Sequence, residues 1–242
     1  MIITLAAMAL GGQPVEPDDD AWDMTHHADH GRVASAAWAS GQALLVRCKD
    51  GRLDVIVNGL PPASSRSRRI EMTLGEVGPE TQTWATTPSA RFASPPEPAR
   101  IARLLADGGE LKLNTAGGEE KQTYALPLPT NGDGIRQVLR DCNQPLQGEH
   151  DRLARLTGDA ITWRRVPALV PPREGVPGEA VVGCIVDTLG RPASCWIEAE
   201  SPTGKGIGAA ALGAARKGLL DVPDDGRDGV RLIRFTTRYN FD

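Results

Sequence analysis

Three of the four histidines of this 242-residue chain, His26, His27 and His30, lie close together near the N-terminus. Asp23 and Asp29 stand beside them. Imidazole and carboxylate groups are ligands for zinc, nickel or copper, so this cluster could hold a metal ion. The residues are contiguous, however, and only His26 and His30 have the four-residue spacing of a helix face. We therefore interpret the stretch as a solvated loop and keep metal or small-ligand binding as the alternative hypothesis.

The glycine-rich segment Gly204–Gly208, which contains Lys205, could bind a phosphate group. A P-loop needs a further glycine where this chain has Ala199, and a serine or threonine where it has Gly206. The strict Gly-x-Gly-x-x-Gly pattern of dinucleotide-binding folds is also missing from this segment. We expect no nucleotide cofactor and interpret these glycines as the entry to a helix.

Nucleophilic catalysis has little support in the sequence. There is no Gly-x-Ser-x-Gly motif, and the remaining histidine, His150, lies far along the chain from the N-terminal cluster. The four cysteines contain no Cys-x-x-Cys pair, so neither a zinc ribbon nor a thioredoxin-type redox motif is indicated. We expect a non-enzymatic protein without cofactors.

Cys184 and Cys195 stand on two apolar runs that flank a turn, which is typical of a β-hairpin. A turn centred on Leu189-Gly190 would place Asp187 opposite Pro192. Counting outward then places Cys184 opposite Cys195. Opposed residues of antiparallel strands have Cα atoms roughly 4.5–5.5 Å apart, a separation that suits a disulfide.

The other two cysteines are Cys48 and Cys142. A bond between them would join a central strand to the last helix of the N-terminal region. In the chain-entropy model, closing so long a loop stabilises the folded state by about 4–5 kcal/mol. Two disulfides imply an oxidising compartment, here the periplasm or cell envelope. The apolar N-terminus, with Ala7-x-Ala9, is interpreted as a degenerate export signal; a start further upstream and a disordered tail are the alternatives.

The composition excludes several classes of partner. The net charge is −4 and the pI is about 5.6, which gives no electrostatic reason to bind nucleic acid or an anionic membrane. Hydrophobic residues make up 40% and charged residues 24% of the chain, as in ordinary globular proteins. Nothing approaches the run of about 20 apolar residues that a membrane span requires.

The pattern of apolar and turn residues predicts an α+β fold with two domains. Short strands with turns between them predict an antiparallel N-terminal domain, with helices at Pro98–Ala106 and Gly134–Asp141. The C-terminal part predicts strand, strand, helix at Ile207–Leu220, and strand at Val230–Tyr239. The expected regions are a signal or tether at 1–21, a β-rich domain at 22–145, a proline-rich linker at 146–177, and a ββαβ domain at 178–242.

The last 65 or so residues carry a set of spacings that includes turn glycines, a small-residue helix start and two cysteines. They are Gly175-x-x-Gly178, Gly183-Cys184, Gly190, Cys195, Glu200-x-Pro202-x-Gly204-x-Gly206-x-Gly208, Ala210-Ala211-Leu212, Pro223, Gly226 and Phe235. This arrangement resembles the C-terminal domain of the TonB family, in a cysteine-bearing subgroup. The resemblance implies a periplasmic interaction domain linked to outer-membrane transport, which pairs its edge strand with a peptide of another envelope protein. The implied edge residues are Arg231, Ile233, Phe235 and Thr237.

Residues 22–145 resemble, more distantly, periplasmic type VI secretion accessory proteins and invasion-associated locus B proteins. The residues that carry this second resemblance are Val46-Arg47-Cys48, Trp84 and Val138-x-x-x-Cys142. TonB itself has a long proline-rich spacer, whereas the extended stretch here runs only from Pro167 to Pro177. At about 3.1 Å per residue so short a stretch cannot bridge the periplasm, so we do not expect energy transduction.

Overall fold

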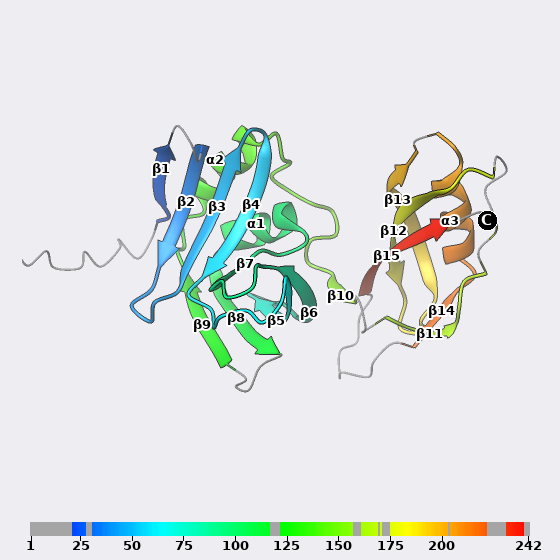
Figure 1. The fold of residues 1–242 in the computed structure, drawn as a ribbon, viewed down its shortest axis with the longest axis horizontal. Helices are drawn as coiled ribbons and strands as arrows, with labels where there is room; N and C mark the ends of the chain where they lie inside the picture. The colour runs from blue at the N-terminus through cyan, green and yellow to red at the C-terminus, as the bar shows by residue number, and fades with distance from the viewer. Residues whose placement is uncertain are drawn as a thin grey trace, which may run out of the picture.

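Figure 1 shows the computed structural model of the chain, which is α+β with mostly antiparallel sheets, as the sequence predicts. The strands and helices gather into an N-terminal and a C-terminal body. The residues that the structure describes are 21–27, 31–116, 122–156, 161–168, 170, 175–202, 204–221 and 231–239.

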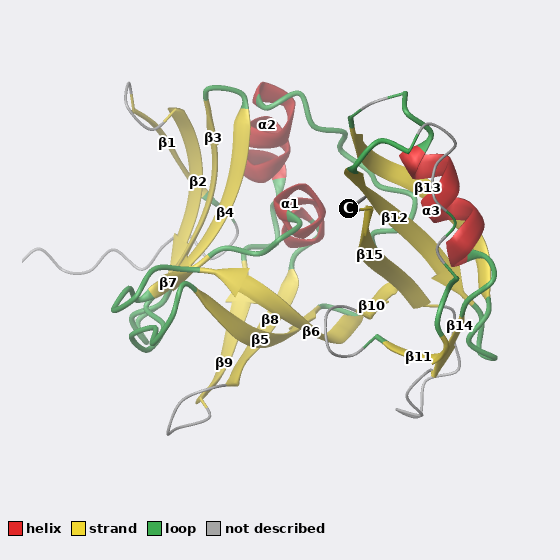
Figure 2. Ribbon diagram, turned by 45° about the vertical axis from the view of Figure 1, so that its right-hand side comes forward, coloured by secondary structure: helices red, strands yellow, loops and turns green. Residues whose placement is uncertain are grey.

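The N-terminal body contains two antiparallel sheets and two helices. One sheet has the order β1-β2-β3-β4-β7 and the other β6-β5-β8-β9, while α1 and α2 lie beside the first sheet (Figure 2). The elements are β1 (Asp23–His27), β2 (Gly31–Ala37), β3 (Ala43–Lys49), β4 (Arg52–Asn58), β5 (Ser67–Leu74), β6 (Val77–Ala85), β7 (Phe92–Ala93), α1 (Pro98–Ala106), β8 (Gly109–Ala116), β9 (Gln122–Leu128) and α2 (Asp133–Asp141).

Alternating apolar residues build the core between these layers. In β3 and β4 every second side chain is buried, because successive residues of a strand point to opposite faces. The apolar stripe of α1, with Ile101 and Leu105, packs into the same core as the stripe of α2, with Ile135 and Leu139. The predicted bounds of α1 are those observed, since its proline-marked start and the glycines behind it are strong local signals.

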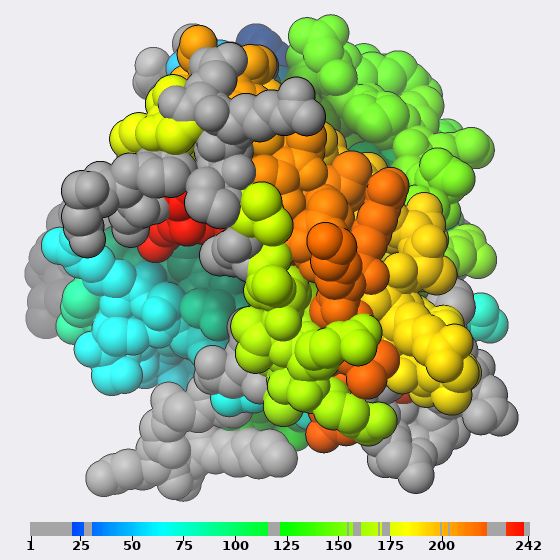
Figure 3. All heavy atoms as spheres, turned by 90° about the vertical axis from the view of Figure 1, so that its right-hand side faces the viewer, coloured from blue at the N-terminus to red at the C-terminus, as the bar shows by residue number. Residues whose placement is uncertain are grey.

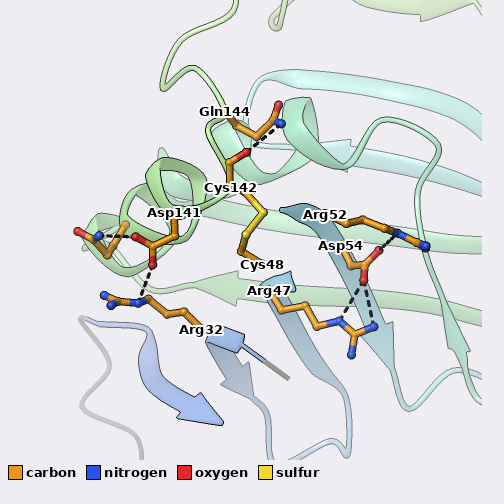
Figure 4. The surroundings of a disulfide bond; sticks show 9 residues. Arg32, Arg47, Cys48, Arg52, Asp54, Asp141, Cys142 and Gln144 are labelled. Carbon is orange, nitrogen blue, oxygen red and sulfur yellow. Dashed lines mark hydrogen bonds and ion pairs between the residues drawn. A yellow bond between two sulfur atoms is a disulfide. The ribbon is translucent and has the colours of Figure 1, made fainter. Parts of the chain in front are cut away.

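A disulfide fastens α2 to the first sheet. Cys48 on β3 and Cys142, directly after α2, have Cα atoms 5.4 Å apart (Figure 4). Beside the bond, Arg32 on β2 forms an ion pair with Asp141 at 2.7 Å. Covalent and ionic contacts therefore hold the end of α2 in place.

The C-terminal body is built on a four-stranded sheet of order β10-β15-β12-β13, with α3 on one face. A separate two-stranded ribbon joins β11 to β14. The elements are β10 (Ala154–Leu156), β11 (Thr162–Arg165), β12 (Gly178–Val186), β13 (Pro192–Ser201), α3 (Ile207–Ala215), β14 (Leu219–Asp221) and β15 (Arg231–Tyr239). All pairings are antiparallel except β10 with β15, which is parallel.

The β12–β13 hairpin has the predicted cysteine register but not the predicted turn. Cys184 lies directly opposite Cys195, with Cα atoms 4.1 Å apart in a disulfide. Near the turn, however, Val186 and not Asp187 is opposite Pro192, because the register shifts by one residue after Ile185. A β-bulge therefore separates the cysteine pair from the turn. Counting outward from the turn gives the correct partner for Cys184 but the wrong partner for Pro192.

The stretch 146–177 is not the simple linker that its composition predicts. It contributes β10 to the main C-terminal sheet and β11 to the ribbon. Proline content gives no information on these pairings, because the partner strands come from positions more than 50 residues later. The β11 pairing also explains why α3 ends at Ala215 rather than Leu220: Leu219–Asp221 pairs with β11 instead of continuing the helix.

Candidate functional site

Residues 145–156 form a strap that is fixed to the N-terminal body by a buried ion pair. Arg100 on α1 donates to both carboxylate oxygens of Glu80 on β6, at 2.9 and 2.7 Å, and the two side chains are 3% and 0% exposed. Arg100 also donates from Nε to the carbonyl of Asp151 at 2.9 Å. The backbone N–H of Arg155 donates to Glu80 at 3.0 Å. Arg100 donates as well to the Leu153 carbonyl at 3.3 Å, so the strap is attached to the same pair at three points.

The strand β6 explains how a buried glutamate is tolerated. Glu80, Gln82 and Trp84 alternate along one face of β6 and form a chain of hydrogen bonds. Trp84 Nε1 donates to Gln82, whose amide donates to Glu80 at 3.0 Å. A charge can be buried at acceptable cost only when it is paired and hydrogen-bonded, and Glu80 is both.

The other end of the strap belongs to the C-terminal body. Residues of β10 pair with the start of β15, where Ala154 is opposite Arg231 and Leu156 is opposite Ile233. Leu156 is buried in the C-terminal core. The same dozen residues thus contact both bodies and bring the face of the C-terminal sheet that α3 does not cover toward α1 (Figure 2).

A cleft of about 570 Å³ lies between α1 and this uncovered sheet face. Cross-strand neighbours Gly183, Trp196 and Arg234 share that face. The Trp196 ring contacts the ring of His150 on the strap, with centroids 4.8 Å apart. The lining residues come from five segments: Gly51, Arg52 and Leu53; Pro96 to Arg100 with Arg103; Gln144, Asp151 and Arg155; Glu198 on β13; and Arg234 on β15.

Glu97 stands at the centre of the charges in the cleft. One of its carboxylate oxygens is 3.5 Å from Arg155 Nε, and the other is 3.9 Å from Arg234 Nη1. Burial lowers the pKa of Arg155, and the charge of Arg100 lowers it further, while Glu97 and other carboxylates act in the opposite direction. Arg234 has a second partner, Glu198 on β13. Glu97 therefore links an arginine of the strap with one of the C-terminal sheet.

The predicted edge residues of β15 have different surroundings from those expected. Arg231 and Ile233 are not at the edge, because β10 pairs with them. Phe235 packs edge-on against Trp163 of β11, with ring centroids 5.5 Å apart, and Thr237 is buried. The true outer strand on the opposite side of the sheet is β13. Sequence order alone could not reveal this, since the strap reaches β15 from outside the predicted domain.

The histidine cluster was predicted to be a loop, but Asp23–His27 forms strand β1 at the edge of the first sheet. His26 is opposite Arg32, and its side chain is exposed. The side chain of His27, together with Asp29 and His30, lies outside the described residues. Within the described part of the chain, no three His, Cys, Asp or Glu side chains are grouped so that they could hold a metal ion.

The glycine-rich segment is the start of α3, and the protein's own carboxylate occupies it. Glu200 accepts hydrogen bonds from the backbone N–H of Gly204 and of Gly208, both at 2.7 Å. These two bonds lower the pKa of Glu200. A helix N-terminus attracts an anion, and Glu200 fills that position here.

The residues that build the cleft were missed in the sequence because they are widely separated. Glu80 and Arg155, for example, are 75 positions apart. The period-two pattern Glu80-x-Gln82-x-Trp84 is the one local signal of a polar chain on a buried strand face. Comparison with family models, with curated proteins and with solved structures finds no match for this chain. None of the helices in the described ranges is long and apolar enough to cross a membrane.

Proposed function

We propose that this is a non-enzymatic cell-envelope protein that binds an extended segment of another envelope protein by strand addition to its C-terminal sheet, in a role linked to outer-membrane transport. The observation that carries the proposal is the outer edge of β13. This ten-residue strand pairs with β12 on one side, and no described strand pairs with its other side. An unpaired edge presents a row of N–H and C=O groups that a partner strand can use.

The middle of β13 is the part best suited to receive a partner. Ser194–Ile197 pairs regularly with β12, between two register shifts that bend the ends of the strand. Bulges at the ends of an edge limit how long an added strand can be, so a short peptide fits better than a whole sheet. The disulfide at Cys195 fixes this segment, and Ile197 is 41% exposed. In Figure 3 the yellow atoms of the β12–β13 hairpin reach the surface beside the orange atoms of α3.

The resemblance to TonB C-terminal domains also supports a role in protein binding. That resemblance points to the last strand, but β10 pairs with the first three residues of β15. We therefore assign the binding edge to β13. A periplasmic location is in keeping with two disulfides, which form in oxidising compartments. No cysteine is free to act as a nucleophile, because all four are bonded.

Peptide selection and hydrogen exchange test the proposal. Peptides selected by display against the full, oxidised protein are measured by fluorescence anisotropy with wild type and with Ile197→Lys. A charge on a strand edge opposes strand pairing, so we expect binding to weaken by about tenfold or more. Thr25→Lys, on the exposed edge strand β1, is the matched control and leaves binding unchanged.

Bound peptide also protects backbone amides of Ser194–Ile197 from hydrogen exchange. Equal peptide affinity in Ile197→Lys, together with unchanged exchange in this segment, contradicts the proposal. So does a selection that yields no binding peptide.

A further inference from the structure

The cleft between α1 and the C-terminal sheet is open to solvent and has the volume of a small-molecule site. Its volume is about 570 Å³, and binding pockets occur preferentially where two structural units meet. One wall is held by the Cys48–Cys142 disulfide, whose cysteines lie four and two residues before the lining residues Arg52 and Gln144 (Figure 4). The strap closes another side. These walls are attached covalently or by buried ion pairs, so the cleft is preorganised.

Arginine is the predominant charged residue of the lining, with five arginines and three carboxylates. Two of the arginines are fully used in holding the strap. Arg100 is bound to Glu80, and Arg103 donates to both oxygens of Asp151 at 2.5 and 2.9 Å. The other lining arginines are less completely bonded: Arg155 donates from Nη1 to the His150 carbonyl at 3.1 Å, and Arg234 pairs through Nε with Glu198. Arg52, whose side chain is 82% exposed, stands at the rim.

Arg155 and Arg234 are incompletely satisfied by the carboxylate between them. Their distances to Glu97 are 3.5 and 3.9 Å, longer than the 2.7–2.9 Å of a charge-assisted hydrogen bond. The Nε of Arg155 is buried and has no hydrogen-bond partner. A buried donor without a partner is costly, and an oxyanion placed beside it would remove that cost.

We propose that the cleft binds a small molecule through an oxyanion, a carboxylate or a phosphate, held between Arg155 of the strap and Arg234 of β15. The planar fork of a guanidinium group matches the two oxygens of either anion. Arg155 on β10 is opposite Leu232 on the neighbouring strand β15, and Arg234 lies two residues further along that strand on the same face, so one anion can contact both. This inference is independent of strand addition at β13, because the cleft lies on the opposite face of the sheet from α3.

Substitution of Glu97 should change anion affinity in the opposite direction to substitution of the arginines. Its negative charge satisfies the two arginines in part and repels an incoming anion. Replacing Glu97 with glutamine removes the repulsion and retains the shape of the side chain. Binding should therefore become tighter in this variant, whereas loss of either arginine should weaken it.

Isothermal titration calorimetry with inorganic phosphate and with citrate tests the proposal on the full, oxidised protein, with sodium chloride at matched ionic strength as the reference. We expect saturable heat for at least one probe in wild type. Arg155→Gln and Arg234→Gln should each weaken binding about tenfold or more, the loss of a hydrogen bond to a charged group. Glu97→Gln should strengthen it about fivefold, the effect of one like charge at close range. Arg238→Gln, on the same strand but outside the cleft lining, should bind as wild type does.

Heat from phosphate alone assigns a phosphate ligand, and heat from citrate alone assigns a carboxylate. Two results overturn the proposal: no saturable heat from either probe at millimolar concentration, or equal affinity in wild type and Arg234→Gln. Circular dichroism checks the fold of each variant. If Arg155→Gln does not fold, Arg234→Gln and Glu97→Gln decide the outcome, because the Arg234 side chain is 35% exposed and Glu97 forms only long contacts with its arginines.

Discussion

Arg100 and Glu80 face each other as a bidentate ion pair in the interior, at the point where the strap lies on the N-terminal body. Each also bonds to the backbone of the strap, through Asp151 and Arg155. One buried pair therefore determines how a segment from the middle of the chain is placed, and with it the wall of the cleft.

Glu80→Gln should destabilise the protein strongly. The substitution leaves the Arg100 guanidinium buried without its counter-charge, and breaking a buried pair in this way costs about 3–5 kcal/mol. Denaturant unfolding measures the change in the free energy of unfolding. The control is Glu110→Gln in the exposed Lys112–Glu110 pair, where a change within about 0.5 kcal/mol is expected. A loss below about 1 kcal/mol in Glu80→Gln would show that the pair does not anchor the strap.

The two disulfides should differ in their contribution to stability. The bonded cysteines are 94 positions apart in Cys48–Cys142 and 11 apart in Cys184–Cys195. In the chain-entropy model these loops correspond to about 4–5 and about 3 kcal/mol. The double variant Cys48→Ser/Cys142→Ser should therefore unfold at lower denaturant than Cys184→Ser/Cys195→Ser. Thiol titration of the unreduced wild type should find no free cysteine; four free thiols would also remove the argument for an oxidising compartment.

Glu200 should make stability depend on pH in the acid range. Hydrogen bonds from Gly204 and Gly208 lower the pKa of this carboxyl below its ordinary value of 4.5 in the folded protein. The stabilisation is therefore complete above pH 4.5 and is lost as the pH falls toward the folded-state pKa. Thermal unfolding from pH 7 to pH 3 should show Glu200→Gln less stable than wild type at neutral pH, with the difference shrinking in acid. Glu179→Gln is the control, and a Glu200→Gln difference independent of pH would contradict the assignment.

Gly190 and Gly204 should respond differently to alanine. Both have a positive φ, +81° and +74°, which costs a non-glycine residue about 1–2 kcal/mol. A Cβ at Gly190 would lie 2.1 Å from the carbonyl oxygen of Leu220, whereas a Cβ at Gly204 meets no atom within 4 Å. Gly190→Ala should thus cost about 3 kcal/mol or more, and Gly204→Ala only the conformational part. Equal losses in denaturant unfolding would show that the β12–β13 turn does not pack on β14.

Local patterns in the sequence were sufficient for much of the secondary structure. The helix at Pro98–Ala106 and the facing of Cys184 and Cys195 depend on residues close together in the chain, and both are observed. The role of the Gly204–Gly208 segment as a helix entry is also local, although the carboxylate that occupies it was not foreseen. Local rules failed at β1, where the partner strand β2 and not the composition of Asp23–His27 makes the strand.

The cleft and the strap were decided only by the tertiary structure. A charge on Glu80 or Arg100 suggests an exposed surface when it is considered alone, because an unpaired charge cannot be buried cheaply. Glu80 and Arg100 are buried because they pair with each other and bond to the strap. Arg100 bonds to Asp151, 51 positions away, and Glu80 bonds to Arg155, 75 positions away. The sequence by itself determined the main strands, the places of the three helices and the facing of Cys184 and Cys195, but not β1, β10, β11 or β14. Which strand lies at the edge, and which arginines face the cleft, followed from long-range pairing that no short segment encodes.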